Sequence, residues 1–216
     1  MEYTLENKLM KTGTTTIGLV CKDGIILAAD MRVTMGNIVG NKRFDKVYKI
    51  TDNLALTTAG TVSDVQLLMK LIKAQLSLNK LRTKRDSSVK EAANLIGMLV
   101  YENIRKFSTI PGITGFLLGG RDHTGLYLYE IAPDGSVIKA DDYVTDGSGM
   151  VMAVGVLDTL YKPGMSVDEG IKLAVKAINA SIQRDTYTGE GINVWTITRS
   201  GVKKALTKEL DTNITV

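Results

Sequence analysis

The chain has 216 residues, enough for one domain with a sizeable core, and its 44% hydrophobic and 23% charged content is ordinary for a globular protein. One cysteine excludes an internal disulfide framework and fits a reducing compartment, while no apolar run approaches the ~20 residues of a membrane span. The net charge of +4 is mildly basic, and we interpret the one dense basic run, residues 80–85, as a solvated loop between two helices rather than a nucleic-acid site.

Residues 1–13 are expected to form a short leader ahead of a single domain. Their apolar residues, Leu5, Leu9 and Met10, are interrupted by Glu6 and Lys8. The segment therefore lacks the apolar core of a signal peptide, and we expect a purpose other than secretion and a cytoplasmic protein.

The first part of the domain is predicted to consist of two hairpins. Strands are expected over residues 14–21 and 25–29, joined by a turn signal at 22–24. A second hairpin is expected to pair residues 46–50 with residues 54–58.

Two helices follow. Apolar residues recur at helical spacing from Val62 to Leu76 and again from Val89 to Phe107, the second time after a plausible N-cap region at 86–88.

The rest of the chain returns to strands, then helices, then strands. Ser166 and Glu169 form the pattern of a capping box at the start of the last helix. The expected elements are strands at 115–119 and 126–131, a small helix after 147–149, a helix over 166–184, and strands at 194–198 and 202–206.

This order of elements predicts the fold class. Hairpins dominate, so the sheets should be mostly antiparallel. Each sheet needs a covering layer, and the economical solution is an α+β protein in which two stacked sheets lie between two helix layers, a four-layer αββα sandwich.

The common hydrolase and metal sites are poorly supported. The single histidine, His123, lies in a polar turn, and the single cysteine, Cys21, shares strand parity with Ile17 and Leu19 and is expected to be a core residue. A Ser-His-Asp or Cys-His site and a zinc site are therefore disfavoured. The glycines match neither a P-loop nor GxGxxG, and we expect no metal and no cofactor.

A threonine run offers a different chemistry. If the chain is cut after Gly13, Thr14 carries a hydroxyl and a free amine on one residue and needs no histidine as base. Taken singly, each residue has an ordinary explanation, since threonine favours strands, Asp30 could be a turn residue, Lys46 a surface lysine and Asp185 a charge at a helix end.

Their joint occurrence is more specific. Nine short motifs follow one another along the chain: Gly13-Thr14-Thr15-Thr16, Ala29-Asp30-Met31-Arg32-Val33-Thr34, Lys46-Val47-Tyr48-Lys49-Ile50, Ala59-Gly60, Asp64, Gly119-Gly120, Gly147-Ser148-Gly149, Val167-Asp168-Glu169-Gly170 and Gln183-Arg184-Asp185. As a set they resemble the proteasome β-type subunits, closest to the archaeal kind, which belong to the N-terminal nucleophile hydrolases. The resemblance implies the αββα sandwich of that group, a threonine endopeptidase, and no metal or cofactor.

The resemblance also implies roles for residues. Residues 1–13 correspond to a cleavable propeptide and residues 14–216 to the catalytic domain, with autocatalytic cleavage between Gly13 and Thr14. Thr14 resembles the nucleophile, and its α-amine, which titrates near ~7.7–8.0, resembles the general base. Lys46 resembles the active-site lysine, whose charge disfavours protonation of the amine, and Asp30 the carboxylate that fixes it.

Further residues match the surroundings of the terminal amine and the substrate. Ser148 and Asp185 resemble the groups around the amine, with Thr188 where a serine is usual. The backbone N–H of Gly60 is the implied oxyanion-hole donor. An extended peptide is expected to add as a strand between Thr34 and residues 60–62.

The implied specificity pocket has four wall residues: Val33, Phe44, Thr58 and Val62. Thr58 stands where many archaeal members have methionine. With no charged residue among these four, we expect a preference for apolar or aromatic side chains before the cut.

The implied partners are copies of this chain in a heptameric β ring, α-type subunits, an ATP-dependent unfoldase and unfolded polypeptide substrates, with no nucleic acid and no membrane. Two alternatives stay open: an unprocessed structural β-type subunit that depends on another β subunit, and an N-terminal nucleophile amidase of a small molecule. An α-type subunit is disfavoured because it would lack the Gly-Thr junction.

Overall fold

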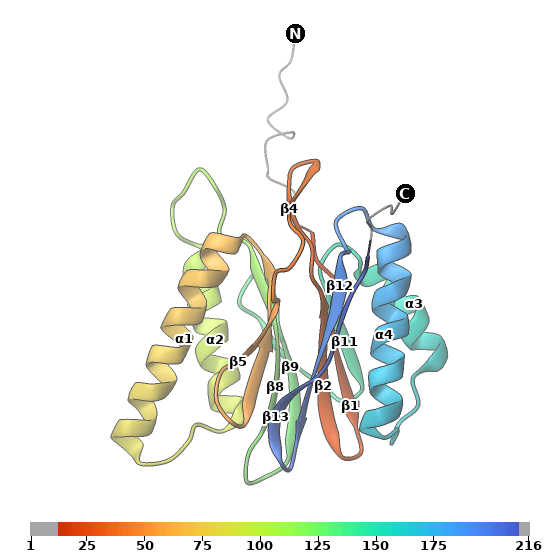
Figure 1. Cartoon of the computed structure of the whole chain (residues 1–216). Helices are drawn as coiled ribbons and strands as arrows, with labels where there is room; N and C mark the ends of the chain where they lie inside the picture. The colour runs from red at the N-terminus through yellow and green to blue at the C-terminus, as the bar shows by residue number, and fades with distance from the viewer. Residues whose placement is uncertain (1–12, 212–216) are drawn as a thin grey trace.

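The computed structural model describes residues 13–211, and it has the four-layer arrangement that the element order predicts. Figure 1 shows the large sheets facing each other in the middle, with helices on the outer face of each. The α+β sandwich is therefore confirmed. Of the predicted propeptide, only Gly13 is among the described residues, and residues 1–12 lie outside them.

The first sheet is antiparallel throughout and contains the strands nearest the predicted nucleophile. Its order is β11 (Tyr143–Asp146), β1 (Thr16–Cys21), β2 (Gly24–Asp30), β12 (Gly191–Thr198) and β13 (Gly201–Glu209). The predicted turn at 22–24 and the hairpin that closes the chain both join neighbours in this sheet.

The second sheet faces the first and is also antiparallel. Its order is β10 (Val137–Ala140), β9 (Leu126–Ile131), β8 (Thr114–Arg121), β6 (Leu54–Thr57) and β5 (Val47–Lys49), with the short β7 (Ala59–Gly60) paired to β8. A separate hairpin, β3 (Val33–Met35) with β4 (Ile38–Asn41), extends beyond the sheets. Five short strands were not predicted, because each has only two to four residues and no alternating pattern of its own: β3, β4, β7, β10 and β11.

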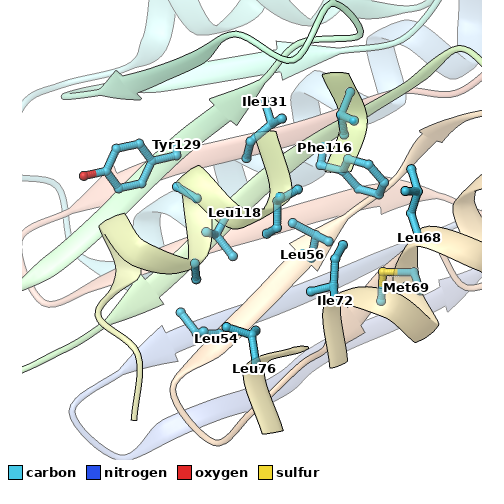
Figure 2. Close-up of a cluster of buried hydrophobic side chains, with 14 of the residues drawn as sticks. Leu54, Leu56, Leu68, Met69, Ile72, Leu76, Phe116, Leu118, Tyr129 and Ile131 are labelled. Atoms are coloured by element: carbon cyan, nitrogen blue, oxygen red, sulfur yellow. The ribbon is translucent and has the colours of Figure 1, made fainter. Parts of the chain in front are cut away.

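The second sheet is covered by α1 (Val62–Thr83) and α2 (Val89–Ile104). Figure 2 shows their buried side chains packing on β6, β8 and β9. The capping region predicted at 86–88 is present, since the Ser88 hydroxyl accepts the N–H of Glu91 and the Glu91 carboxylate accepts the N–H of Ser88.

Two predictions about these helices are wrong at their ends. Residues 80–85 are not all loop, because α1 continues through Thr83 and ends at Lys84, whose φ of 60° is left-handed. The stretch after Leu76 contains strong helix formers without Gly or Pro, so the helix propagates past its buried stripe. Phe107 is not part of α2 but fully exposed beyond it, because the buried Asn103 side chain donates to the Gly112 carbonyl and folds the chain back.

The first sheet is covered by α3 (Met150–Leu160) and α4 (Val167–Arg184). The capping box of Ser166 and Glu169 is confirmed. Cys21 packs with Ile17 and Leu19 in this layer. The pKa of its thiol is raised to about 12, mainly by burial. Cys21 is therefore a core residue, as its strand parity predicts.

Strand register brings four chain segments to one end of the sandwich. Thr16 pairs with Ala29 on one side and with Asp146 on the other, while Ile192 pairs with Asp30. The start of β1, the ends of β2 and β11, and the start of β12 therefore meet. The candidate site is built at this end.

No helix among residues 13–211 is both long enough and apolar enough to cross a membrane.

Candidate active site

Thr14 lies two residues before the start of β1 and is 6% exposed. The bond to Gly13 is intact in this structure, and the Thr14 hydroxyl donates to the Gly13 carbonyl oxygen over 2.6 Å. The hydroxyl is thus held beside the peptide group that the sequence analysis predicts to be cut. The backbone N–H of Thr14 donates to Ser148 Oγ at 3.3 Å.

Asp30, fully buried at the end of β2, accepts hydrogen bonds on both carboxylate oxygens. Oδ1 accepts the Lys46 ammonium at 2.8 Å and the N–H of Thr15 at 3.0 Å. Oδ2 accepts the N–H groups of Arg32 at 3.0 Å and Gly189 at 3.1 Å. Three amides and one ammonium compensate the buried charge and fix the plane of the carboxylate.

Lys46 joins this carboxylate to the predicted cleavage point. Its Nζ also donates to the Gly13 carbonyl oxygen over 3.4 Å. Burial, the largest effect, lowers the pKa of the ammonium, while the Asp30 carboxylate partly opposes that change by raising it. The ammonium therefore releases its proton more readily than that of an exposed lysine does.

On the other side of Thr14, hydroxyl groups form a chain around Asp185, the residue that caps α4. Asp185 Oδ2 accepts the hydroxyl of Ser148 at 2.6 Å and that of Thr188 at 2.5 Å. Because Thr188 spends its proton on Asp185, it accepts the hydroxyl of Thr15 at 2.7 Å. Ser148, for the same reason, accepts from the backbone N–H of Thr14. The hydroxyls of Ser148 and Thr188 thus both donate to the Asp185 carboxylate.

Two glycines allow backbone segments of the site to come close together. Gly147 has a φ of 99°, and a Cβ there would lie 2.1 Å from the Thr14 carbonyl oxygen. Gly60 has a φ of 120°, and a Cβ there would lie 2.1 Å from the carbonyl oxygen of Ile113. Both positions require glycine sterically, which explains why these two residues occur next to the predicted nucleophile and in the predicted oxyanion segment.

A cavity opens beside Thr14. It is lined by the following residues: Gly13, Thr14, Arg32, Val33, Thr34, Phe44, Lys46, Thr58, Gly60, Val62 and Val65. Every residue predicted to bind substrate is among them. The hydroxyl of Thr34 is buried at its wall without a hydrogen-bond partner in the described structure.

The structure thus brings all the predicted catalytic residues to one place. Thr14 and Lys46 both donate to the Gly13 carbonyl oxygen, and Lys46 forms an ion pair with Asp30. The residues predicted to surround the amine, Ser148 and Thr188, both contact Asp185. Gly60, the predicted oxyanion-hole residue, lines the cavity. The Gly13 carbonyl oxygen accepts its hydrogen bonds from the Thr14 hydroxyl and Lys46 Nζ.

Sequence reasoning missed three polar residues and one apolar one. Thr15 bonds to both sides of the site, and Arg32 forms an ion pair with Glu190 at its edge. Val65 completes the cavity wall. Thr15 and Arg32 belong to motifs that carry the resemblance, but they were given no role in the chemistry, while Glu190 lies 158 positions from Arg32 and gave no signal.

No group of three or more His, Cys, Asp or Glu side chains in the described part of the chain is placed to hold a metal ion.

A family model described as "Proteasome subunit" matches residues 10–197. The chain belongs to the proteasome subunit family. Relatives that match it over most of its length are named "Proteasome subunit beta", so it is a β-type member.

Three archaeal relatives of the family illustrate the similarity. The chain is 42% identical over 207 residues to "Proteasome subunit beta" of Ferroglobus placidus, covering 96% of each chain. It is 41% identical to "Proteasome subunit beta" of Archaeoglobus fulgidus, covering 90% of this chain and 89% of that one. It is 43% identical to "Proteasome subunit beta 2" of Pyrococcus furiosus, covering 92% and 94%. Membership in a family of protease subunits agrees with the resemblance carried by the short motifs.

Proposed function

We propose that this proteasome β-type subunit is a threonine endopeptidase that frees its own nucleophile. The observation that carries the proposal is the pair of hydrogen bonds on the Gly13 carbonyl oxygen, from the Thr14 hydroxyl at 2.6 Å and from Lys46 Nζ at 3.4 Å. They put a nucleophile and a cation on one peptide group.

In the maturation step, Thr14 Oγ1 bonds to the Gly13 carbonyl carbon, and water takes the hydroxyl proton and delivers it to the Thr14 nitrogen when that nitrogen departs. The Lys46 ammonium stabilises the negative charge that develops on the carbonyl oxygen. The C–N bond then breaks, the nitrogen takes a proton beside Ser148, and an ester and a free amine remain. Water hydrolyses the ester, which releases residues 1–13 with a Gly13 carboxylate.

In the mature subunit, the freed amine of Thr14 takes the proton of the Thr14 hydroxyl as that hydroxyl attacks a substrate carbonyl. Lys46 keeps the amine unprotonated by charge repulsion, while Asp30 fixes Lys46 and three backbone amides fix Asp30. Ser148, Asp185 and Thr188 orient the amine. Gly60 donates to the oxyanion of the substrate, and the chemistry uses no metal and no cofactor.

Substrate binds as an extended strand between Thr34 and residues 60–62, with the side chain before the cut in the cavity lined by Val33, Phe44, Thr58 and Val62. The protein works in the cytoplasm as part of a heptameric β ring stacked on α-type subunits. An ATP-dependent unfoldase supplies unfolded polypeptide. The names of the archaeal relatives support the β-ring assignment.

The proposal is tested by co-expressing the full chain with an archaeal proteasome α subunit and measuring the intact mass of the β chain and its hydrolysis of fluorogenic peptides. Loss of residues 1–13 together with peptide hydrolysis is the expected result. A particle that assembles with the leader intact and hydrolyses nothing would favour a structural subunit. A processed chain that cleaves small amides but no peptide would favour an amidase.

A further inference from the structure

Arg32 and Glu190 form an ion pair at the edge of the site to which neither the motifs nor the proposed chemistry gives a role. Arg32 Nε and Nη2 both donate to Glu190 Oε1, at 3.2 and 2.9 Å. Arg32 Nη1 donates to the Thr186 carbonyl at 2.8 Å. The side chains are 23% and 6% exposed, so the pair is largely withdrawn from water.

The guanidinium therefore spans the loop from Thr186 to Glu190, which connects α4 to β12. This loop carries Thr188, whose hydroxyl donates to Asp185, and Gly189, whose N–H donates to Asp30. The guanidinium also packs on the loop backbone, since a Cβ on Gly189 would lie 2.5 Å from Arg32 Cζ. The side chain of Arg32 covers the segment on which both carboxylates of the site depend.

The loop needs such a restraint because its backbone is not relaxed. Glu190 has a φ of 67°, in the left-handed region that residues with a Cβ rarely adopt. A residue stays there only when its surroundings hold it. The two bonds from Arg32 to the Glu190 carboxylate supply that hold, and the strain is located two residues from Thr188.

The backbone of Arg32 acts on the same carboxylate as the loop. Its N–H donates to Asp30 Oδ2, the oxygen that also accepts the N–H of Gly189, and the N–H of Met31 donates to the Gly189 carbonyl. A shift of the loop would therefore turn the Asp30 carboxylate and move Lys46 with it. The positive charge of Arg32 also acts on Lys46 and favours a lower pKa of the ammonium.

We propose that Arg32 is a positioning residue for the threonine peptidase reaction: with Glu190 it forms a clamp that holds the 186–190 loop and so aligns Asp30 and Lys46 on one side of Thr14 with Asp185 and Thr188 on the other. The proposal rests on the proposed function. Since Arg32 also lines the cavity, direct contact with substrate is the competing explanation, and it predicts a different kinetic pattern.

The experiment uses the core particle assembled from this chain and an α subunit, with rates normalised to the amount of chain that begins at Thr14 by intact mass. Arg32→Ala is expected to lower kcat by about 10²-fold with little change in KM, because the reacting groups lose their alignment while the pocket walls remain. Arg32→Lys is expected to restore little, because one ammonium cannot reach both Glu190 and the Thr186 carbonyl. Arg43→Ala is the matched control, since it removes an exposed ion pair with Glu209 and should leave kcat unchanged.

Chemical rescue supplies a readout that general destabilisation would not give. Millimolar ethylguanidine should raise the kcat of Arg32→Ala by filling the vacated space, and ethylurea, of similar shape but uncharged, should not. If Arg32→Ala does not assemble, Glu190→Gln keeps the size of the partner, and a smaller but clear loss of kcat is expected from it.

The outcomes separate the two proposals. Three results would overturn the clamp and leave the peptidase proposal in place: a normal kcat in folded Arg32→Ala, an effect of Arg32→Ala on KM alone, or full activity in Arg32→Lys. If Arg32→Ala cannot be assembled, a normal kcat in Glu190→Gln would have the same consequence. Both proposals would be overturned if the wild-type particle did not hydrolyse peptides, or if its hydrolysis did not depend on Thr14.

Discussion

Two carboxylates flank Thr14, and they are satisfied in different ways. Asp30 is fully buried and accepts three backbone amides and an ammonium. Asp185, at the end of α4, is only partly buried and accepts two hydroxyls and the N–H of Tyr187. The side facing the Thr14 hydroxyl is therefore fixed by charge in a dry environment, while the side facing the amine is fixed by neutral hydroxyls that can rotate. We expect substitutions on the Asp30 side to be the more damaging.

The largest effect is expected from Lys46→Ala. It removes the cation next to the Gly13 carbonyl and leaves the buried Asp30 without its charged partner. We expect a loss of kcat of about 10³-fold and a decrease of about 3 kcal/mol in the free energy of unfolding. Peptidase rates of the assembled particle measure the first effect, and denaturant unfolding of the isolated chain measures the second.

Lys49→Ala is the matched control for that substitution, since Lys49 ends β5, the strand that begins directly after Lys46, and forms an exposed pair with Asp52. It should change neither quantity appreciably. A folded Lys46→Ala variant with near-normal turnover would reduce Lys46 to a structural charge and remove the contrast between the two sides.

The next effect concerns pH. Burial lowers the pKa of Lys46 and Asp30 raises it, so Asp30→Asn should lower it further. Because the proposed mechanism needs a protonated Lys46, activity is expected to fall as pH rises through that pKa, and the alkaline limb of kcat/KM should move to lower pH in the variant. The pH profile of the residual activity measures this, and a limb that stays in place or moves to higher pH would speak against a protonated Lys46.

A smaller effect is expected on the other side of Thr14. Thr188→Val keeps the shape but removes the hydroxyl that donates to Asp185 and accepts from Thr15. Leaving these groups unpaired costs about 1–3 kcal/mol, which we expect to appear as a roughly tenfold lower kcat. Thr188→Ser keeps the hydroxyl and should stay close to wild type, so equal losses in both variants would contradict a hydrogen-bonding role.

The smallest effect is expected at the pocket and concerns selectivity. Thr58→Met adds a flexible apolar side chain to a wall shared with Phe44 and Val33. It should increase the preference for large apolar residues before the cut by about 1–3 kcal/mol at most. The measurement is kcat/KM on peptides that differ only at that residue. A wild-type enzyme that cuts after Glu or Arg faster than after Leu would refute this pocket assignment.

The sequence predicted those parts of the molecule whose signals are local. The hairpin turn at 22–24, the capping box of Ser166 and Glu169, and the helical spacing from Val62 to Leu76 each depend on neighbours within a few residues, and the structure has all three. The end of α1 could not be predicted from its buried stripe, because the helix formers after Leu76, such as Leu78, Lys80 and Leu81, favour a helix although they are exposed.

The site was predictable where short motifs carry it and not where distant segments meet. Asp30 and Lys46 belong to recognisable motifs, and the resemblance that these motifs carry implied the contact that the structure has. The pairing of Arg32 with Glu190 joins residues far apart in the chain, and it depends on the path of the 186–190 loop. Neither residue type nor spacing contains that path, so only the folded structure reveals it.

The central claim is that one hydroxyl performs both maturation and peptide hydrolysis, and Thr14→Ala tests it most directly. In a particle assembled with an α subunit and no other β subunit, intact mass should show a β chain that keeps residues 1–13, and hydrolysis of fluorogenic peptides should be absent. Thr14→Ser should retain part of both activities, because serine keeps the hydroxyl but loses the methyl that restricts χ1. A Thr14→Ala chain that is still cut after Gly13, or that still hydrolyses peptides, would contradict the account.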